Sequence, residues 1–236
     1  MQIQEHPMKN STTPFFTTKL VAELATKLTS KLFGAPLRRY AKQLANLSLL
    51  VLVSACASTE LQHSYDFGSS TKLPTSSQLA TLKLSLADIQ VTASLDGNVM
   101  LYRLMYDNPQ ALRPYANSRW SMSPAQLLKQ RIIARINQEG GTVTTSADGI
   151  AGMPTLKIDL EEFAQHFSDP THSQVQLRWR ATLVSNKRLI AQKIFSAQSN
   201  SPSADPAGGA KAMPEASDQT ISELISWLQT QLTLNK

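Results

Sequence analysis

The chain has 236 residues, of which 42% are hydrophobic and 17% charged, a balance typical of a folded protein. This composition excludes wholesale disorder, and the length allows one large domain or two small ones. The net charge of +6 suggests nucleic-acid binding, but the charge is unevenly placed. Seven of the 23 basic and two of the 17 acidic residues precede Cys56, which leaves 16 basic and 15 acidic residues after it. Because this remainder is nearly neutral, we expect no nucleic-acid partner.

The residues before Cys56 follow the order of a secretory signal peptide. A basic region at 38–42 comes first, residues 44–53 carry no charge, and the small residues 54–55 precede Cys56. The uncharged run is shorter than the ~20 residues that a membrane-spanning helix needs, which disfavours the alternative of a transmembrane anchor. Residues 1–37 are long for a leading region of this kind, so we expect translation to begin at a downstream codon.

Cys56 is the only cysteine of the chain, and Val53-Ser54-Ala55-Cys56 resembles the bacterial lipobox. Small side chains let a membrane peptidase reach the backbone, and the sulfur can take a diacylglyceryl group. We therefore expect a lipid-modified Cys56 bearing diacylglyceryl and N-acyl chains, with 1–55 as signal peptide and 56–63 as a tether. The alternative is a buried free cysteine in a core helix. An exported protein should hide or use an unpaired thiol, and lipidation agrees with this because it removes the free thiol.

The first elements predicted after the tether are strands. Residues 64–68 (SYDFG) favour a short strand, and 79–91 favour a longer one because leucines alternate with polar residues. A turn at 96–98 (DGN) leads into a strand over 99–106 that we expect to pair with its predecessor. Residues 107–115 are predicted to form a loop.

A helix is predicted to begin at Ser123-Pro124, with serine as the N-cap and proline in the first helical position. Gly140-Gly141 is expected to end it. Between these limits one apolar stripe recurs at helical spacing, formed by Leu127, Leu128, Ile132, Ile133 and Ile136.

The second half repeats the order of strands followed by a helix. Strands are predicted over 155–163 and 174–184, and the latter turns back into a hairpin partner. A loop over 200–211 precedes a last helix that begins near Pro214. The fold class expected for 64–236 is a single α+β domain, a two-layer sandwich with a mostly antiparallel sheet and two main helices on one face.

Signatures of catalysis are missing from the sequence. It contains no nucleophile elbow, no phosphate-binding loop and no zinc or calcium motif, so we predict a protein that is not an enzyme and has neither cofactor nor metal. The alternative is a periplasmic enzyme that uses His166 and His172 with Asp159, Glu161 and Glu162. A solvated strand face with loop histidines explains these residues more simply.

Aromatic and arginine side chains concentrate between residues 100 and 132. Such residues are enriched at interaction hot spots, because rigid rings bury large areas and guanidinium groups bind carbonyls and acids. An alternative for Tyr115 and Trp120 is that they attach the helix start to the sheet. The candidate partner-binding residues are Tyr102, Tyr106, Tyr115, Arg119 and Trp120.

In the order and spacing of several short motifs, the sequence resembles the auxiliary lipoproteins of ABC-type transport systems. The motifs are Tyr65-Asp66-Phe67-Gly68, the strand 101–106, Tyr115-Ala116 with Arg119-Trp120, the helix start 124–128, the strands 156–163 and 174–195, and Trp227. A proline- and glycine-rich insertion at 202–209 departs from the family pattern.

This resemblance implies an outer-membrane-anchored lipoprotein on the periplasmic face. Its expected partners are an MCE-domain protein and an ABC permease and ATPase, which together would move lipids or other hydrophobic molecules between membranes. Ala57 after the lipidated cysteine favours outer-membrane sorting, since aspartate there favours retention in the inner membrane. Self-association is left open. The alternative function is an assembly lipoprotein that places lipopolysaccharide or outer-membrane proteins.

Overall fold

The fold is given by a computed structural model that describes residues 61–68, 79, 81–145, 148, 150 and 152–234. The predicted signal peptide, Cys56 and most of the tether lie outside the described residues.

Three long antiparallel strands form the main part of the sheet: β7 (Thr155–Asp169), β8 (His172–Ser185) and β9 (Arg188–Asn200). Alternate residues of β8 from Val175 to Leu183 are fully buried, as their spacing predicts. Asn186 and Lys187 both have positive φ, which is the geometry of the tight turn that joins β8 to β9.

The other edge of β7 is shared by three short strands that follow one another in sequence and all run parallel to it. They are β2 (Lys83–Leu86), β3 (Gln90–Val91) and β4 (Val99–Leu104), and a short 3-10 helix, η3 (Ala93–Leu95), lies between the last two. On one side, β6 (Thr142–Thr145) pairs with β2. On the other, β5 (Asn108–Trp120) pairs with β4, and β1 (His63–Tyr65) pairs with β5.

The α+β class is confirmed, but the sheet is mixed rather than mostly antiparallel. Among the described strands, β7–β8, β8–β9 and β4–β5 are antiparallel and the other pairings are parallel. The predicted hairpin between 79–91 and 99–106 is wrong, because both segments pair with β7 instead of with each other. The predicted loop over 107–115 is also wrong, since these residues belong almost entirely to β5.

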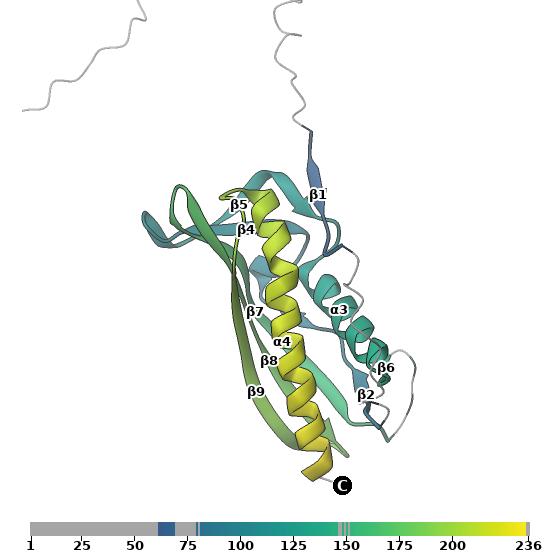
Figure 1. Cartoon of the computed structure of the whole chain (residues 1–236). Coiled ribbons are helices and arrows are strands. Elements are labelled where there is room, and N and C mark those ends of the chain that lie inside the picture. Colours follow the sequence, from purple (N-terminus) through teal and green to yellow (C-terminus); the bar gives the residue numbers. More distant parts are fainter. Residues whose placement is uncertain are drawn as a thin grey trace, which may run out of the picture. The chain divides into compact units, whose positions relative to one another are not determined.

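The two helices lie on the same side of the sheet (Figure 1). The first, α3 (Pro124–Gln138), begins with the predicted serine cap: Gln126 N–H donates to Ser123 Oγ, and the Gln126 side chain accepts from Ser123 N–H. The second, α4 (Pro206–Leu234), begins eight residues before the predicted start and contains Pro214 within it. Its first turn is capped by Asp205, whose Oδ1 accepts from the Gly208 N–H at 2.7 Å.

A buried ion pair joins the two helices. Arg131 of α3 is 7% exposed and donates two hydrogen bonds, of 2.7 and 2.6 Å, to the carboxylate of Asp218 in α4. Helix α4 also contacts the sheet, where Trp179 Nε1 donates to Thr220 Oγ1 at 3.2 Å. These contacts fix the helices to each other and to the β7–β9 strands.

Replacement of Gly208 by alanine is expected to lower the free energy of unfolding by about 1–3 kcal/mol. An unhindered glycine-to-alanine change inside a helix would instead raise it by about 1 kcal/mol. The sign reverses because a Cβ at this position would collide with the backbone carbonyl of Ser203. Urea unfolding measures the effect, with the exposed Lys211→Ala on the same helix as control. A more stable Gly208→Ala variant would contradict the close approach.

Candidate partner-binding site

Tyr102 of β4 and Tyr115 of β5 form an aromatic pair, with ring centroids 4.5 Å apart. Tyr102 also meets Phe167 of β7 edge-on at 5.9 Å. Both tyrosines are half-buried, and burial is the main cause that raises the pKa of Tyr115 well above its usual value. The Tyr115 hydroxyl therefore stays neutral at pH 7.

Gln165 of β7 connects this tyrosine pair to the start of α4. Its Oε1 accepts from the Tyr115 hydroxyl at 2.9 Å, and its Nε2 lies within hydrogen-bond distance of Ser173, Ser201 and the carbonyl of Asp205. The side chain is 3% exposed, so these partners satisfy a polar group removed from water. No sequence pattern predicted this role, because a single glutamine in a strand matches no binding motif.

The turn between β4 and β5 presents apolar side chains to solvent. Met105 and Tyr106 are 44% and 49% exposed, and Arg113 pairs with Asp107 at 2.8 Å beside them. Met105 was not predicted as a site residue, although its position next to Tyr106 at a turn could have suggested it. We call Met105 and Tyr106 the hairpin tip.

The structure separates the remaining two predicted residues. Arg119 is exposed near the end of β5, where the strand pairs with β1. Trp120 is only 3% exposed and packs against Phe67 and Phe163, with ring centroids at 6.0 and 5.4 Å. Trp120 is thus a core residue, and this corrects its prediction as a partner contact: its ring is enclosed where the β5–α3 connection meets the sheet. Of the predicted residues, Tyr106 and Arg119 are exposed, and Tyr102 and Tyr115 are half-buried.

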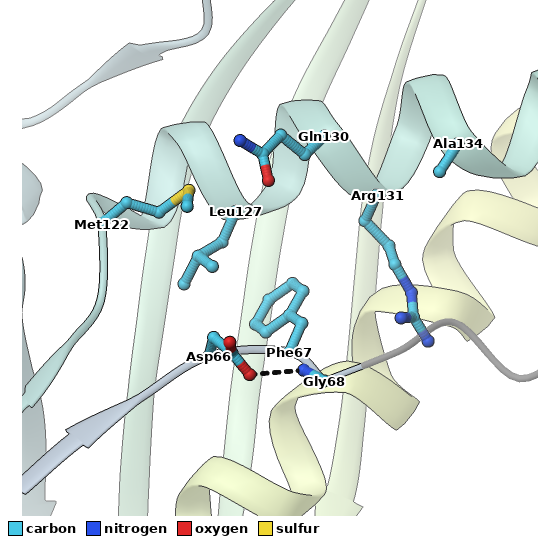
Figure 2. A pocket seen from close by; sticks show the side chains of 8 residues that line it. All are labelled: Asp66, Phe67, Gly68, Met122, Leu127, Gln130, Arg131 and Ala134. Atoms are coloured by element: carbon cyan, nitrogen blue, oxygen red, sulfur yellow. Dashed lines mark hydrogen bonds between the residues drawn. The ribbon is translucent and has the colours of Figure 1, made fainter.

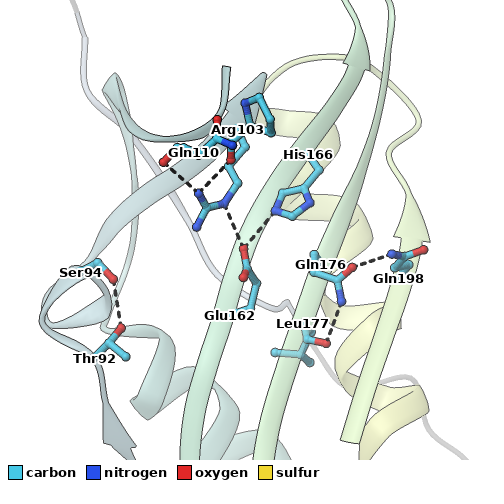
Figure 3. A network of polar contacts seen from close by, with 10 residues as sticks. Thr92, Ser94, Arg103, Gln110, Glu162, His166, Gln176, Leu177 and Gln198 are labelled. Atoms are coloured by element: carbon cyan, nitrogen blue, oxygen red, sulfur yellow. Dashed lines mark hydrogen bonds and ion pairs between the residues drawn. The ribbon is translucent and has the colours of Figure 1, made fainter. Parts of the chain in front are cut away.

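On the opposite face of the sheet, Arg103, Glu162 and His166 form a polar cluster (Figure 3). Glu162 Oε1 accepts from Arg103 Nε at 3.3 Å and lies 3.0 Å from His166 Nε2. Arg103 Nη1 also donates to the carbonyls of Pro109 and Gln110, which ties the β4–β5 hairpin to β7. The His166 hydrogen bond and the positive charge of Arg103 lower the pKa of Glu162, against the opposing effect of burial.

The Glu162 carboxylate is expected to make stability depend on acid pH. Because its folded-state pKa is lowered, its contribution is fully present above the unfolded value of about 4.3 and is lost as pH falls below it. With the side chain 26% exposed, we expect at most about 1 kcal/mol. Urea unfolding between pH 7 and pH 3 should show a shallower decline for Glu162→Gln than for the unmodified chain. The exposed Glu223→Gln is the control, and equal slopes for all three proteins would contradict the prediction.

The histidines proposed for the enzyme alternative do not converge. His166 pairs with Glu162, whereas His172 is exposed at the β7–β8 turn and lies 3.0 Å from Asp169. Within the described residues, no three histidine, cysteine or acidic side chains are grouped closely enough to hold a metal ion. In the same part of the chain, no helix is long and apolar enough to cross a membrane.

Solved structures with this fold are known. A crystal structure of a Xanthomonas campestris protein from family DUF330 matches with a TM-score of 0.61 at 18% identity, over 73% of this chain and 97% of that protein. A crystal structure of a second protein, described as uncharacterized, matches with a TM-score of 0.54 at 15% identity, over 70% of this chain and 97% of the other. At these identities the likeness establishes the fold alone. No curated protein matches the sequence.

The family is established by sequence. The model of the ABC-type transport auxiliary lipoprotein component matches residues 65–224, which is more than half of the chain and runs from the segment after the tether well into α4. The chain therefore belongs to this family, as the order of its motifs predicted. Membership makes it a lipoprotein associated with an ABC transport system.

Proposed function

We propose that this chain is the outer-membrane-anchored auxiliary subunit of an ABC/MCE-type system that moves lipids or other hydrophobic molecules between membranes. The observation that carries the proposal is the family match over 65–224, which follows residues whose pattern predicts a signal peptide and a lipobox. Neither the family match nor the lipobox pattern alone specifies this function. Together they describe a periplasmic domain attached to a membrane and assigned to a transporter.

The anchor follows from the chemistry of Cys56. Three acyl chains on one residue hold a protein on a bilayer far more firmly than a single chain, since each buried CH₂ contributes about 0.8 kcal/mol. The eight tether residues 56–63 span at most about 25 Å when extended. The domain would therefore work close to the membrane surface.

The domain itself would act as an adaptor that binds the other subunits. The hairpin tip and Arg119 provide exposed side chains of the kinds that dominate protein interfaces. Their expected partners are the MCE-domain protein and, through it, the permease and ATPase. No catalytic step is assigned to the domain.

A genetic test separates this function from others. Strains lacking this gene, the MCE-domain gene, or both are compared for sensitivity to hydrophobic toxic compounds. If the proteins act in one system, the double deletion is no more sensitive than the more sensitive single deletion. Additive sensitivity of the double deletion would contradict the proposal.

A further inference from the structure

A pocket of about 200 Å³ lies between α3 and the segment that follows β1 (Figure 2). It has apolar walls from four side chains, Phe67, Met122, Leu127 and Ala134. The sequence placed Phe67 in a motif, Tyr65-Asp66-Phe67-Gly68, to which neither the tyrosine pair nor the hairpin tip gives a role. The pocket is separate from the partner-binding candidates described above.

Arg131, a buried residue of α3, also lines the pocket. Its Nε and Nη2 donate to Asp218, and among the described residues its Nη1 makes no hydrogen bond. Because Asp218 neutralises Arg131, the pocket offers a hydrogen-bond donor without net charge. A carbonyl oxygen suits it better than a phosphate or a carboxylate.

The rim of the pocket is acidic. Asp66 is exposed there, and its Oδ1 accepts from the Gly68 N–H at 2.7 Å, which holds the carboxylate in a tight turn. Gln130, also exposed, is the other polar side chain at the opening. A ligand with a positive group beside its apolar part is therefore favoured by charge.

The volume of the pocket limits what it can hold. Sites for drug-sized molecules enclose about 300–1,000 Å³, and a lipid needs more room than this pocket provides. Pockets that receive one anchoring side chain are common at the centre of protein interfaces. The size, the neutral donor and the acidic rim together indicate a polypeptide rather than a lipid.

We propose that the pocket between α3 and Asp66–Gly68 binds a segment of a transport-system subunit. One leucine, methionine or phenylalanine of that segment enters the pocket. A backbone carbonyl beside it accepts from Arg131 Nη1, and an adjacent lysine or arginine pairs with Asp66. This inference rests on the proposed function for the identity of the partner, while the chemistry of the segment follows from the pocket.

The test uses the full-length lipoprotein in cells, with the photo-crosslinking residue p-benzoylphenylalanine in place of Gln130. After irradiation, the adduct is identified by mass spectrometry. The expected result is a cross-link to an MCE-domain or permease subunit, at a peptide that contains an apolar residue next to a basic one. A lipid adduct, a cross-link to an unrelated protein, or no adduct at all would overturn the proposal.

Two variants with matched controls measure the contribution of the pocket. Ala134→Trp fills it and Asp66→Lys reverses the charge of its rim, and we expect each to lower the yield of co-purified subunits about tenfold. The controls are Asn137→Trp, which adds the same bulk at an exposed position of α3, and Asp96→Lys, which makes the same charge change elsewhere. Asp66→Lys keeps the test decisive if Ala134→Trp fails to fold.

The outcomes separate this inference from the proposed function. If the unmodified protein captures the transport subunits and both pocket variants capture them equally well, the pocket is not the binding site but the function stands. If the unmodified protein captures none of them, the proposed function is wrong, and so is the partner proposed for the pocket.

Discussion

Replacement of Cys56 by alanine is expected to release the protein from the membrane. The lone cysteine closes an uncharged run that follows a basic region, and it ends a Val-Ser-Ala-Cys sequence. Without the thiol no thioether can form, so the acyl chains that hold the domain on the bilayer are absent. Because that hold grows by about 0.8 kcal/mol for each buried CH₂, the change from membrane-bound to soluble should be nearly complete.

Fractionation of cells and labelling with radioactive palmitate measure this effect together. The unmodified chain should carry the label and sediment with outer membranes, whereas Cys56→Ala should carry no label and appear in the soluble fraction. Ser58→Ala, two residues further on, is the control and should behave like the unmodified chain. Palmitate label that persisted in Cys56→Ala would contradict lipidation at this residue.

Replacement of Trp179 by alanine is expected to cost about 3–5 kcal/mol of stability. The indole is fully buried, stacks on Phe195 with ring centroids 4.6 Å apart, and donates a hydrogen bond to Thr220 of α4. The substitution therefore leaves a large cavity between the β8–β9 strands and the helix that covers them. Since the free energy of unfolding of small domains is only about 5–15 kcal/mol, this single change is expected to remove a large share of it.

Urea unfolding followed by far-ultraviolet circular dichroism gives the size of the loss. Trp227→Ala is the matched control, because Trp227 is half-buried at the edge of the same aromatic group and meets Phe195 at 5.9 Å. We expect it to cost clearly less than Trp179→Ala. A loss below about 1 kcal/mol for Trp179→Ala would show that the ring does not fill the core as described.

Elements determined by local chemistry could be predicted from the sequence. The cap and stripe of α3 agree with the structure, and so do the buried alternate residues of β8, because both depend on neighbouring residues in the chain. Helix α4 likewise buries Ile221, Leu224, Ile225 and Leu228 at helical spacing.

Elements determined by distant contacts could not be predicted. Residues 107–115 were predicted to form a loop, but most of them belong to β5, which pairs with β4. Among the described strands, β1 pairs only with the last three residues of β5. Pro109 and Pro114 therefore lie on an unpaired edge of the sheet, where proline is tolerated. Gly208 and Gly209 also indicated a loop. They belong instead to α4. A Cβ at Gly208 would collide with the Ser203 carbonyl and one at Gly209 with the Gln165 side chain, so both positions favour glycine.

The candidate site shows the same limit. Composition selected the candidate residue types, but whether each residue is exposed depends on strand pairing that the sequence does not reveal. Tyr102 and Tyr115 meet only because β4 and β5 form a hairpin, which the predicted loop excluded. Trp120 had two interpretations, and its burial against Phe67 and Phe163 makes it a core residue.

Affinity capture of the full-length lipoprotein from detergent-solubilised membranes tests the proposed function most directly. The captured proteins are identified by mass spectrometry, with the Cys56→Ala form as a control for material recovered without membrane anchoring. The proposed function predicts that an MCE-domain protein and an ABC permease and ATPase are recovered with the anchored protein. Recovery of outer-membrane assembly factors in their place, or of no transport subunit, would contradict it.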